Sequence, residues 1–233
     1  MFSISSVLSS IFLAAILLLY PPFLNAQDND GTTSKNKPSQ NSSIDAMFGL
    51  QYLRKDTLDT YMDREAKSKF GRYSRIIGVS FAKSFEADGS KGSDVFFTCQ
   101  YQVPNVVHGI DSVDYTLTGY QLGICVGGKD VFHANKEFDV VYGLGVQFGG
   151  YYLKRELHVF PYTVAKTKNG VIAPQLVIEA RYFIGDLKLG FKMRGQYDIS
   201  NTNWKQLDTS PLVFGGFSAT GFAFQAMIGY RLN

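Results

Sequence analysis

Hydrophobic and polar residues alternate with a period of two along most of the chain after Ile44. The segment 138–152 shows this most clearly, with Phe, Val, Tyr and Leu at its even positions and mainly Gly, Asp and Gln at its odd positions. Successive side chains of a β-strand point to opposite faces, so the alternation predicts strands. We predict no amphipathic helix in this part of the chain.

Eight segments carry the pattern and are predicted as strands: 44–53, 71–85, 94–104, 113–127, 138–152, 171–184, 187–199 and 221–232. Several reach the roughly 9–11 residues that a tilted strand needs to cross a bilayer. Three of the four odd-numbered connections are long, whereas the last even-numbered one is only Gly185-Asp186. Long external loops and short periplasmic turns are typical of outer-membrane barrels. The pattern predicts an all-β fold, a single eight-stranded antiparallel transmembrane up-and-down β-barrel.

The composition of the two faces separates this fold from a soluble barrel of lipocalin type, which shows the same alternation. A face in water would favour Lys, Glu and Thr, but the polar face here is rich in Gly, Ala, Ser and Gln, with a few charges. Small residues suit a narrow, filled lumen. The apolar face carries Phe, Tyr and Leu, with Tyr often near strand ends, as in interfacial girdles. We therefore favour the membrane barrel over the soluble one.

The N-terminal 43 residues lack the alternation. Residues 11–19 form a short apolar run, and Ala26 follows as a small residue suited to cleavage, so residues 1–26 are predicted as a signal peptide cut after Ala26. No Lys or Arg precedes the run, which keeps an uncleaved anchor as the alternative. Residues 27–43 are almost free of apolar side chains and are predicted as a disordered polar linker. The barrel domain is predicted over 44–233.

Composition supports the sheet and excludes several other classes. Aromatic residues make up 15% of the chain, and the 14 Tyr, 19 Phe and 23 Gly suit antiparallel strands. The net charge of +3 and the absence of a long basic run give no argument for nucleic-acid binding. The two cysteines, Cys99 and Cys125, form neither a disulfide framework nor a metal set. Cys99 is predicted to face lipid and Cys125 the lumen, so both thiols should be free.

With its apolar N-terminal run, its eight alternating segments and its last strand, 221–233, the chain resembles the small outer-membrane barrels. These are the OmpA/OmpX-like or PorT-like proteins of the "outer membrane protein beta-barrel domain" type, within the porin-like superfamily. Gly229 and Tyr230 match the C-terminal assembly signal, although Leu232 and Asn233 replace its terminal Phe. The resemblance implies export to the Gram-negative outer membrane, insertion by the barrel-assembly machinery and contact with outer-membrane lipid.

One group of charged residues is predicted inside the lumen. A two-residue hairpin at Gly185-Asp186 places Glu179 opposite Lys192, and Val177 opposite Arg194. We interpret Glu179, Arg181, Lys192 and Arg194 as a structural ion-pair network, with a gate or proton site as the alternative. Asp198 is a further expected partner.

No catalytic, cofactor-binding or metal-binding residue is predicted. The histidines His108, His133 and His158 all fall in predicted connections, and no spacing requires a catalytic set such as His158 with Glu156 and Ser210. The loop 54–70 is dense in both charge signs, which fits either a solvated loop or a binding surface. We therefore hypothesise a non-enzymatic barrel with a filled lumen, acting in structure, adhesion or secretion through an unidentified protein or surface ligand at its external loops. A small-solute pore and a rim-active enzyme are the alternatives.

Overall fold

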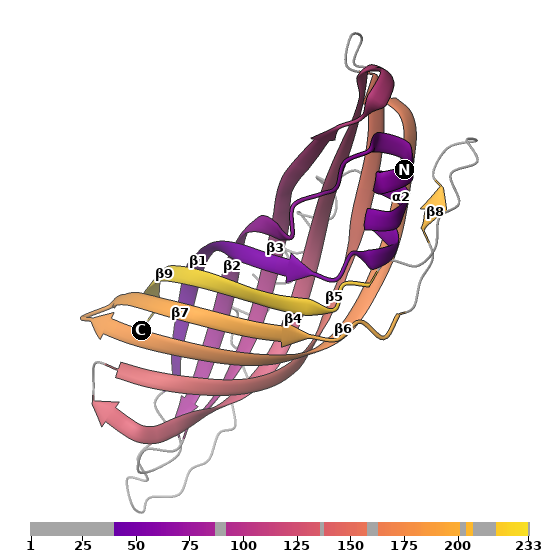
Figure 1. Cartoon of the computed structure of the whole chain (residues 1–233). Helices are drawn as coiled ribbons and strands as arrows, with labels where there is room; N and C mark the ends of the chain where they lie inside the picture. The colour runs from indigo at the N-terminus through magenta and orange to yellow at the C-terminus, as the bar shows by residue number, and fades with distance from the viewer. Residues whose placement is uncertain are drawn as a thin grey trace, which may run out of the picture. The chain divides into compact units, whose positions relative to one another are not determined.

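The computed structural model describes residues 40–86, 92–135, 138–157, 163–200, 204–206 and 218–232. The chain divides into a unit of residues 1–37 and a second unit that begins at Pro38 and contains every described element. The predicted signal peptide and most of the predicted polar linker therefore lie outside the described residues. The elements, in chain order, are β1 (Gln40–Leu53), α2 (Asp56–Ala66), β2 (Tyr73–Glu86), β3 (Gly92–His108), η1 (Ile110–Ser112), β4 (Val113–Asn135), β5 (Phe138–Leu157), β6 (Thr163–Ile184), β7 (Leu187–Gln196), β8 (Lys205–Gln206) and β9 (Gly221–Leu232) (Figure 1).

All strands except β8 form one closed antiparallel ring. Consecutive strands pair from β1 to β7, β9 pairs with β7, and β1 pairs with β9 to close the barrel. The two-residue strand β8 adds to β6 at Thr167 and Lys168 and does not enter the ring. The predicted eight-stranded up-and-down barrel is confirmed. The first strand begins at Gln40, four residues before the predicted start, so the end of the predicted linker is part of β1.

The β6–β7 hairpin has the predicted register. Glu179 pairs with Lys192 and Val177 with Arg194 across the turn. Gly185 holds the turn with a φ of 60°, a conformation that favours glycine. Cys99 and Cys125 are both free, as predicted.

The outer surface of the ring is apolar. Exposed Phe, Leu, Ile, Val and Tyr side chains point outward from the ring strands, for example Phe48 and Leu144. Aromatic side chains gather at both ends of this belt: Tyr52 stacks on Phe222 at 5.0 Å near the long connections, and Tyr182 and Tyr230 are exposed near the opposite end. Such a belt with aromatic girdles matches a bilayer. Among the described residues, no helix has the length and hydropathy of a membrane-spanning helix.

Four strands project beyond the ring at the end with the long connections. Pairing of β2 with β3 stops at Gln102, and pairing of β6 with β7 stops at Gln175, but β3, β4, β5 and β6 continue past these points (Figure 1). The sequence prediction began the fourth strand at Val113, as observed, but stopped the strands of β3 and β5 too early and began that of β6 too late, with 153–170 as a loop. We call these extensions the projecting wall: 103–108, 113–119, 151–157 and 163–173.

The polarity of the two faces reverses along the projecting wall, and this reversal explains the missed strand ends. Within the belt the inward side chains are polar or small and the outward ones apolar. On the wall the inward side chains Leu117, Leu153 and Ala165 are buried, whereas the outward Lys166 and Lys168 are exposed. The wall has left the bilayer, so its outer face meets water and its inner face needs an apolar partner.

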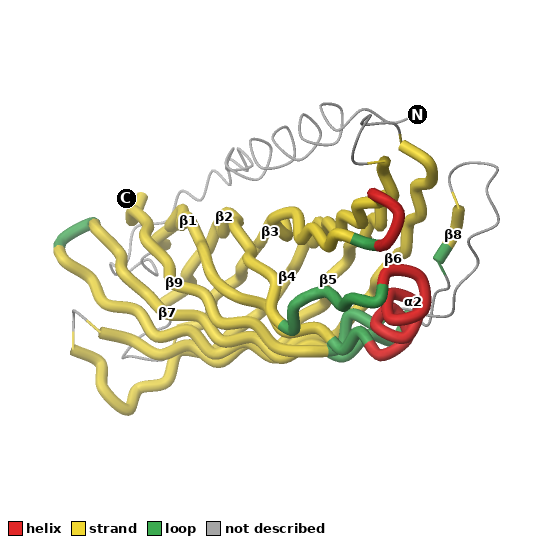
Figure 2. Tube along the Cα trace, turned by 45° about the horizontal axis from the view of Figure 1, so that its top comes forward, coloured by secondary structure: helices red, strands yellow, loops and turns green. Residues whose placement is uncertain are grey.

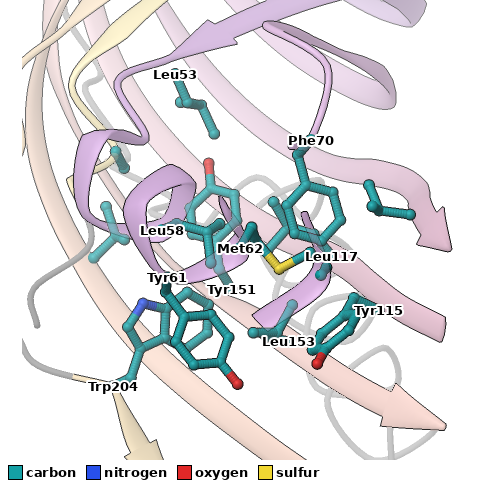
Figure 3. Close-up of a cluster of buried hydrophobic side chains, with 14 of the residues drawn as sticks. Leu53, Leu58, Tyr61, Met62, Phe70, Tyr115, Leu117, Tyr151, Leu153 and Trp204 are labelled. Atoms are coloured by element: carbon teal, nitrogen blue, oxygen red, sulfur yellow. The ribbon is translucent and has the colours of Figure 1, made fainter. Parts of the chain in front are cut away.

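Helix α2 is that partner, and its presence corrects the prediction of a helix-free loop at 54–70. It lies at the end of the barrel opposite the C-terminus, beside the projecting strands (Figure 2). Leu58, Tyr61 and Met62 follow helical spacing and point toward the wall, where they are buried (Figure 3). Asp56 and Asp59 in the first turn complement the helix dipole. The apolar stripe of α2 consists of only four residues, Leu58, Tyr61, Met62 and Ala66, and the dense charges around it hid it in the sequence.

Candidate functional site

The lumen contains a buried cluster of charged side chains on the half that faces the short turns. Glu179 is 1% exposed and is contacted by three cations. Its Oε1 accepts a hydrogen bond from Arg181 Nε at 2.7 Å and lies 3.1 Å from Lys188 Nζ, while its Oε2 lies 3.0 Å from Lys192 Nζ. We call these residues and their further partners the lumen ion-pair cluster.

Three more carboxylates complete the lumen ion-pair cluster. Asp45 of β1 accepts a hydrogen bond from Lys188 at 2.9 Å, and Asp94 of β3 accepts one from Arg181. Asp139 of β5 lies 3.8 Å from Arg181 Nε. The cluster therefore ties together strands on opposite sides of the barrel. Hydrogen-bonded pairing of this kind is what makes buried charge tolerable in a low-dielectric interior.

Arg194 lies outside the cluster, among uncharged amides, so the predicted four-residue network is only partly brought together. Its guanidinium donates to Gln100 Oε1 and, at 3.3 Å, to Gln121 Oε1. The surrounding amide layer consists of Gln51, Gln100, Gln102, Gln121, Gln147, Gln175, Gln196 and Gln225, all buried. Gln121 Oε1 also accepts from Gln147 at 2.7 Å, and Gln100 donates to Gln225 at 3.2 Å.

Helix α2 and the inner face of the projecting wall form a third, apolar layer at the external end. The cluster contains Leu53, Leu58, Tyr61, Met62, Ala66, Phe70, Val107, Val113, Tyr115, Leu117, Tyr151, Leu153, Val171, Ala173, Trp204 and Ala219 (Figure 3). Tyr151 joins it to the amide layer, because its hydroxyl accepts a hydrogen bond from Gln121. Gly119 leaves the space for this ring, since a Cβ there would lie 2.6 Å from the Tyr151 ring. Charged, amide and apolar layers thus follow one another along the lumen.

Lys55 secures the start of α2. The residue is 4% exposed, and its Nζ donates to the carbonyl of Gly71 at 2.8 Å and toward Ser74 Oγ at 3.4 Å. Burial lowers the pKa of Lys55 to about 8, although the Asp59 carboxylate opposes this shift. Burial also raises the pKa of Asp59. Docking of α2 therefore requires an ammonium to be moved out of water at neutral pH.

We expect Lys55 to contribute more to the stability of the barrel as the pH rises from about 8 to about 10.5. In this window the unfolded chain holds a proton on Lys55 that the folded chain has released, so stability increases with pH. The gain is at most on the order of 3 kcal/mol. Tyr61 contributes the opposite slope at the upper end of this window, because burial raises its pKa from 10.0 to about 12 and the unfolded chain releases that proton first; this contribution is common to the wild type and Lys55→Met. Chemical unfolding followed over this pH range should show the stability of the wild type increasing relative to that of Lys55→Met; a difference between the two proteins that does not change with pH would contradict this prediction.

Several members of the lumen layers escaped the sequence prediction although their positions carried the signal. Asp45 and Asp94 occupy inward positions of the alternation, and a search for charges at such positions finds them. Asp198, an expected member, lies beyond β7. It accepts backbone hydrogen bonds from Ser200 and Ala219, both at 2.9 Å, and so orders the connection that follows β7.

The sequence analysis placed all three histidines in connections, but two of them lie in strands. His108 is the last residue of β3, with Nδ1 2.6 Å from Asp114, and its side chain is 75% exposed. His133 lies within β4. His158 and Ser210, considered above with Glu156, lie outside the described residues. Within the described part of the chain, no group of three or more His, Cys, Asp or Glu residues could hold a metal ion.

Solved structures with the same fold are bacterial outer-membrane proteins. A major outer membrane protein from Thermus thermophilus matches with a TM-score of 0.52 and 12% identity, covering 83% of this chain and 100% of the other. Ail of Yersinia pestis, solved with the heparin analogue sucrose octasulfate, matches with a TM-score of 0.47 and 13% identity over 83% of this chain and 99% of Ail. OprG from Pseudomonas aeruginosa matches with a TM-score of 0.44 and 10% identity over 84% and 97%. No protein-family model matches the sequence, and the comparison with curated proteins finds no match.

Proposed function

Because the chain is an outer-membrane β-barrel, we propose that it is a non-enzymatic surface-interaction protein whose barrel anchors the projecting wall in the membrane. The observation that carries this proposal is the filling of the lumen by three successive layers, the last of them α2 against the wall. A barrel of eight strands is just wide enough for its own side chains, and here they are buried in contact with one another. This arrangement supports a role at the outer surface over a role in transport.

The tip of the wall supplies a surface for contact with a partner. Val106 and Ile110 are 48% and 47% exposed, although they lie beyond the apolar belt. We infer that these two exposed apolar side chains take part in binding a protein or surface ligand. Adhesion and assistance in secretion both fit such a surface.

Photo-crosslinking in intact envelopes tests this proposal. A photoreactive amino acid at Val106 should give discrete adducts, whereas the same group at Leu144, which is 69% exposed within the lipid-facing belt, should give none of them. Identical adducts from both positions, or none from Val106 and neighbouring wall positions, would remove the surface role. Saturable uptake of small solutes by vesicles carrying the purified barrel would favour the pore instead.

A further inference from the structure

A basic patch lies on the outer face of the projecting wall, directly above the apolar belt. Lys154 of β5 pairs with Lys166 of β6. Lys168, the next residue of β6 toward the belt that faces outward, pairs with Tyr152. Lys205 of β8 pairs with Lys168 on the other side of β6. Like charges placed directly across an antiparallel pair repel each other, so the fold alone does not favour this arrangement.

The lysines of the patch are only partly neutralised by the protein. Lys154 forms an ion pair with Glu156, and its side chain remains 40% exposed. Lys166 and Lys168 are exposed and form no ion pair with a carboxylate in the part of the chain that the structure describes. The nearest other carboxylate on this face, Asp114, lies opposite Glu156 and contacts His108. At least two positive charges on this face are left for an external anion.

The position of the patch identifies the kind of anion. Going outward along β5 and β6, the exposed Phe148 and Ile172 are followed by Tyr152 opposite Lys168 and then by Lys154 opposite Lys166. Two residues along a strand span about 6.6 Å, so the lysines begin within one or two such steps of the last apolar side chains. Tyr120 and Tyr152 stack at 5.8 Å at this border, and Lys166 Nζ lies 5.5 Å from the Tyr152 ring. Aromatic rings at the edge of an apolar belt mark the level of lipid headgroups.

From this geometry we infer that Lys154, Lys166 and Lys168 bind the phosphate of a phosphorylated lipid in the external leaflet. The long connections place this end of the barrel outside the cell. Lysine side chains lay their methylene groups along apolar surface and place the ammonium at the headgroup level, which suits a lipid whose acyl chains lie on Phe148 and Ile172. A soluble polyanion would use the same charges but would gain nothing from the adjoining belt.

Binding of lipid A to the full-length barrel tests the inference. Native mass spectrometry of the detergent-solubilised protein, titrated with diphosphoryl lipid A, should show a saturable complex, and the dephosphorylated lipid should bind far more weakly. The variant Lys154→Gln/Lys166→Gln/Lys168→Gln should bind diphosphoryl lipid A roughly 25-fold more weakly, since each lysine without a protein partner contributes about fivefold. Heat-dependent gel migration confirms that each variant still forms the barrel.

A matched control removes the same charge elsewhere on the external end. Arg64, Lys67 and Lys69 are exposed on α2 and in the segment that follows it, and their triple change to Gln should leave lipid A binding unchanged. An equal loss of lipid A binding in this control would show that the lipid is attracted to any basic surface and that the three lysines do not form a specific site. Equal binding of the dephosphorylated lipid, or an unaffected lysine variant, would refute the inference. Tight lysine-dependent binding of sucrose octasulfate that exceeds lipid A binding would assign the patch to a soluble sulfated glycan instead.

Discussion

Replacing Glu179 by alanine is expected to destabilise the barrel by about 3–5 kcal/mol, because it leaves buried cations without their shared carboxylate. The three cations do not suffer equally. Arg181 keeps Asp94 and Asp139, and Lys188 keeps Asp45. Lys192 loses the carboxylate at 3.0 Å and keeps the Phe96 ring, whose centroid is 5.1 Å away. Lys192 is therefore the charge that makes the single substitution costly.

A second substitution, at Lys192, should relieve the loss of stability caused by Glu179→Ala. Glu179→Ala with Lys192→Met removes both charges and should recover a large part of the lost stability, whereas Glu179→Ala with Arg181→Met should not, since Arg181 retains two carboxylates. Urea unfolding of the barrel in lipid vesicles measures these three variants and the single Lys192→Met on one scale. Additive effects of Glu179→Ala and Lys192→Met would show that the two side chains do not interact.

Introducing a charge under α2 is expected to release this helix from the wall. Met62 is completely buried between α2 and the wall, and Met62→Asp would place a carboxylate among Leu58, Leu117 and Leu153. Burying an unpaired carboxylate costs several kcal/mol, so undocking becomes the cheaper outcome. The amide groups of α2 should then exchange with solvent at least about 100-fold faster, while those of the ring strands keep their protection.

The same helix offers a control for the helix-release experiment. Arg64 is exposed on α2, so Arg64→Asp introduces the same carboxylate without burying it. We expect its exchange rates to match the wild type. Fast exchange of α2 in the wild type itself, or no change in Met62→Asp, would show that the helix is not held by the apolar layer.

The barrel was predictable from sequence because strand alternation is a local property that burial and lipid enforce at every second residue. The Gly185-Asp186 turn even fixed the pairing of Glu179 with Lys192. Strand ends were harder to predict, because the polarity of each face reverses where the wall leaves the bilayer. A rule that assumes one apolar face along a whole strand stops at Tyr152, although β5 continues to Leu157.

The lumen was predictable in its composition and not in its detailed contacts. Inward charges and glutamines could be read from the alternation, but which of them meet depends on the stagger between distant strands. Arg194 shows the difference: it lies two residues from Lys192 on the same face, yet it contacts Gln100 of β3 and no residue of the ion-pair cluster. Helix α2 could not be placed without the wall, since its four apolar side chains form a continuous packing surface only against the wall.

Electrical recording in a planar bilayer is the most direct measurement of the central claim that the lumen is filled. The purified wild-type barrel should carry no steady current, because the ion-pair cluster, the amide layer and α2 close the lumen in succession. Met62→Asp should remain closed as well, since the two deeper layers stay in place. A stable, ion-selective conductance from the wild-type protein would contradict the account and would make the barrel a pore.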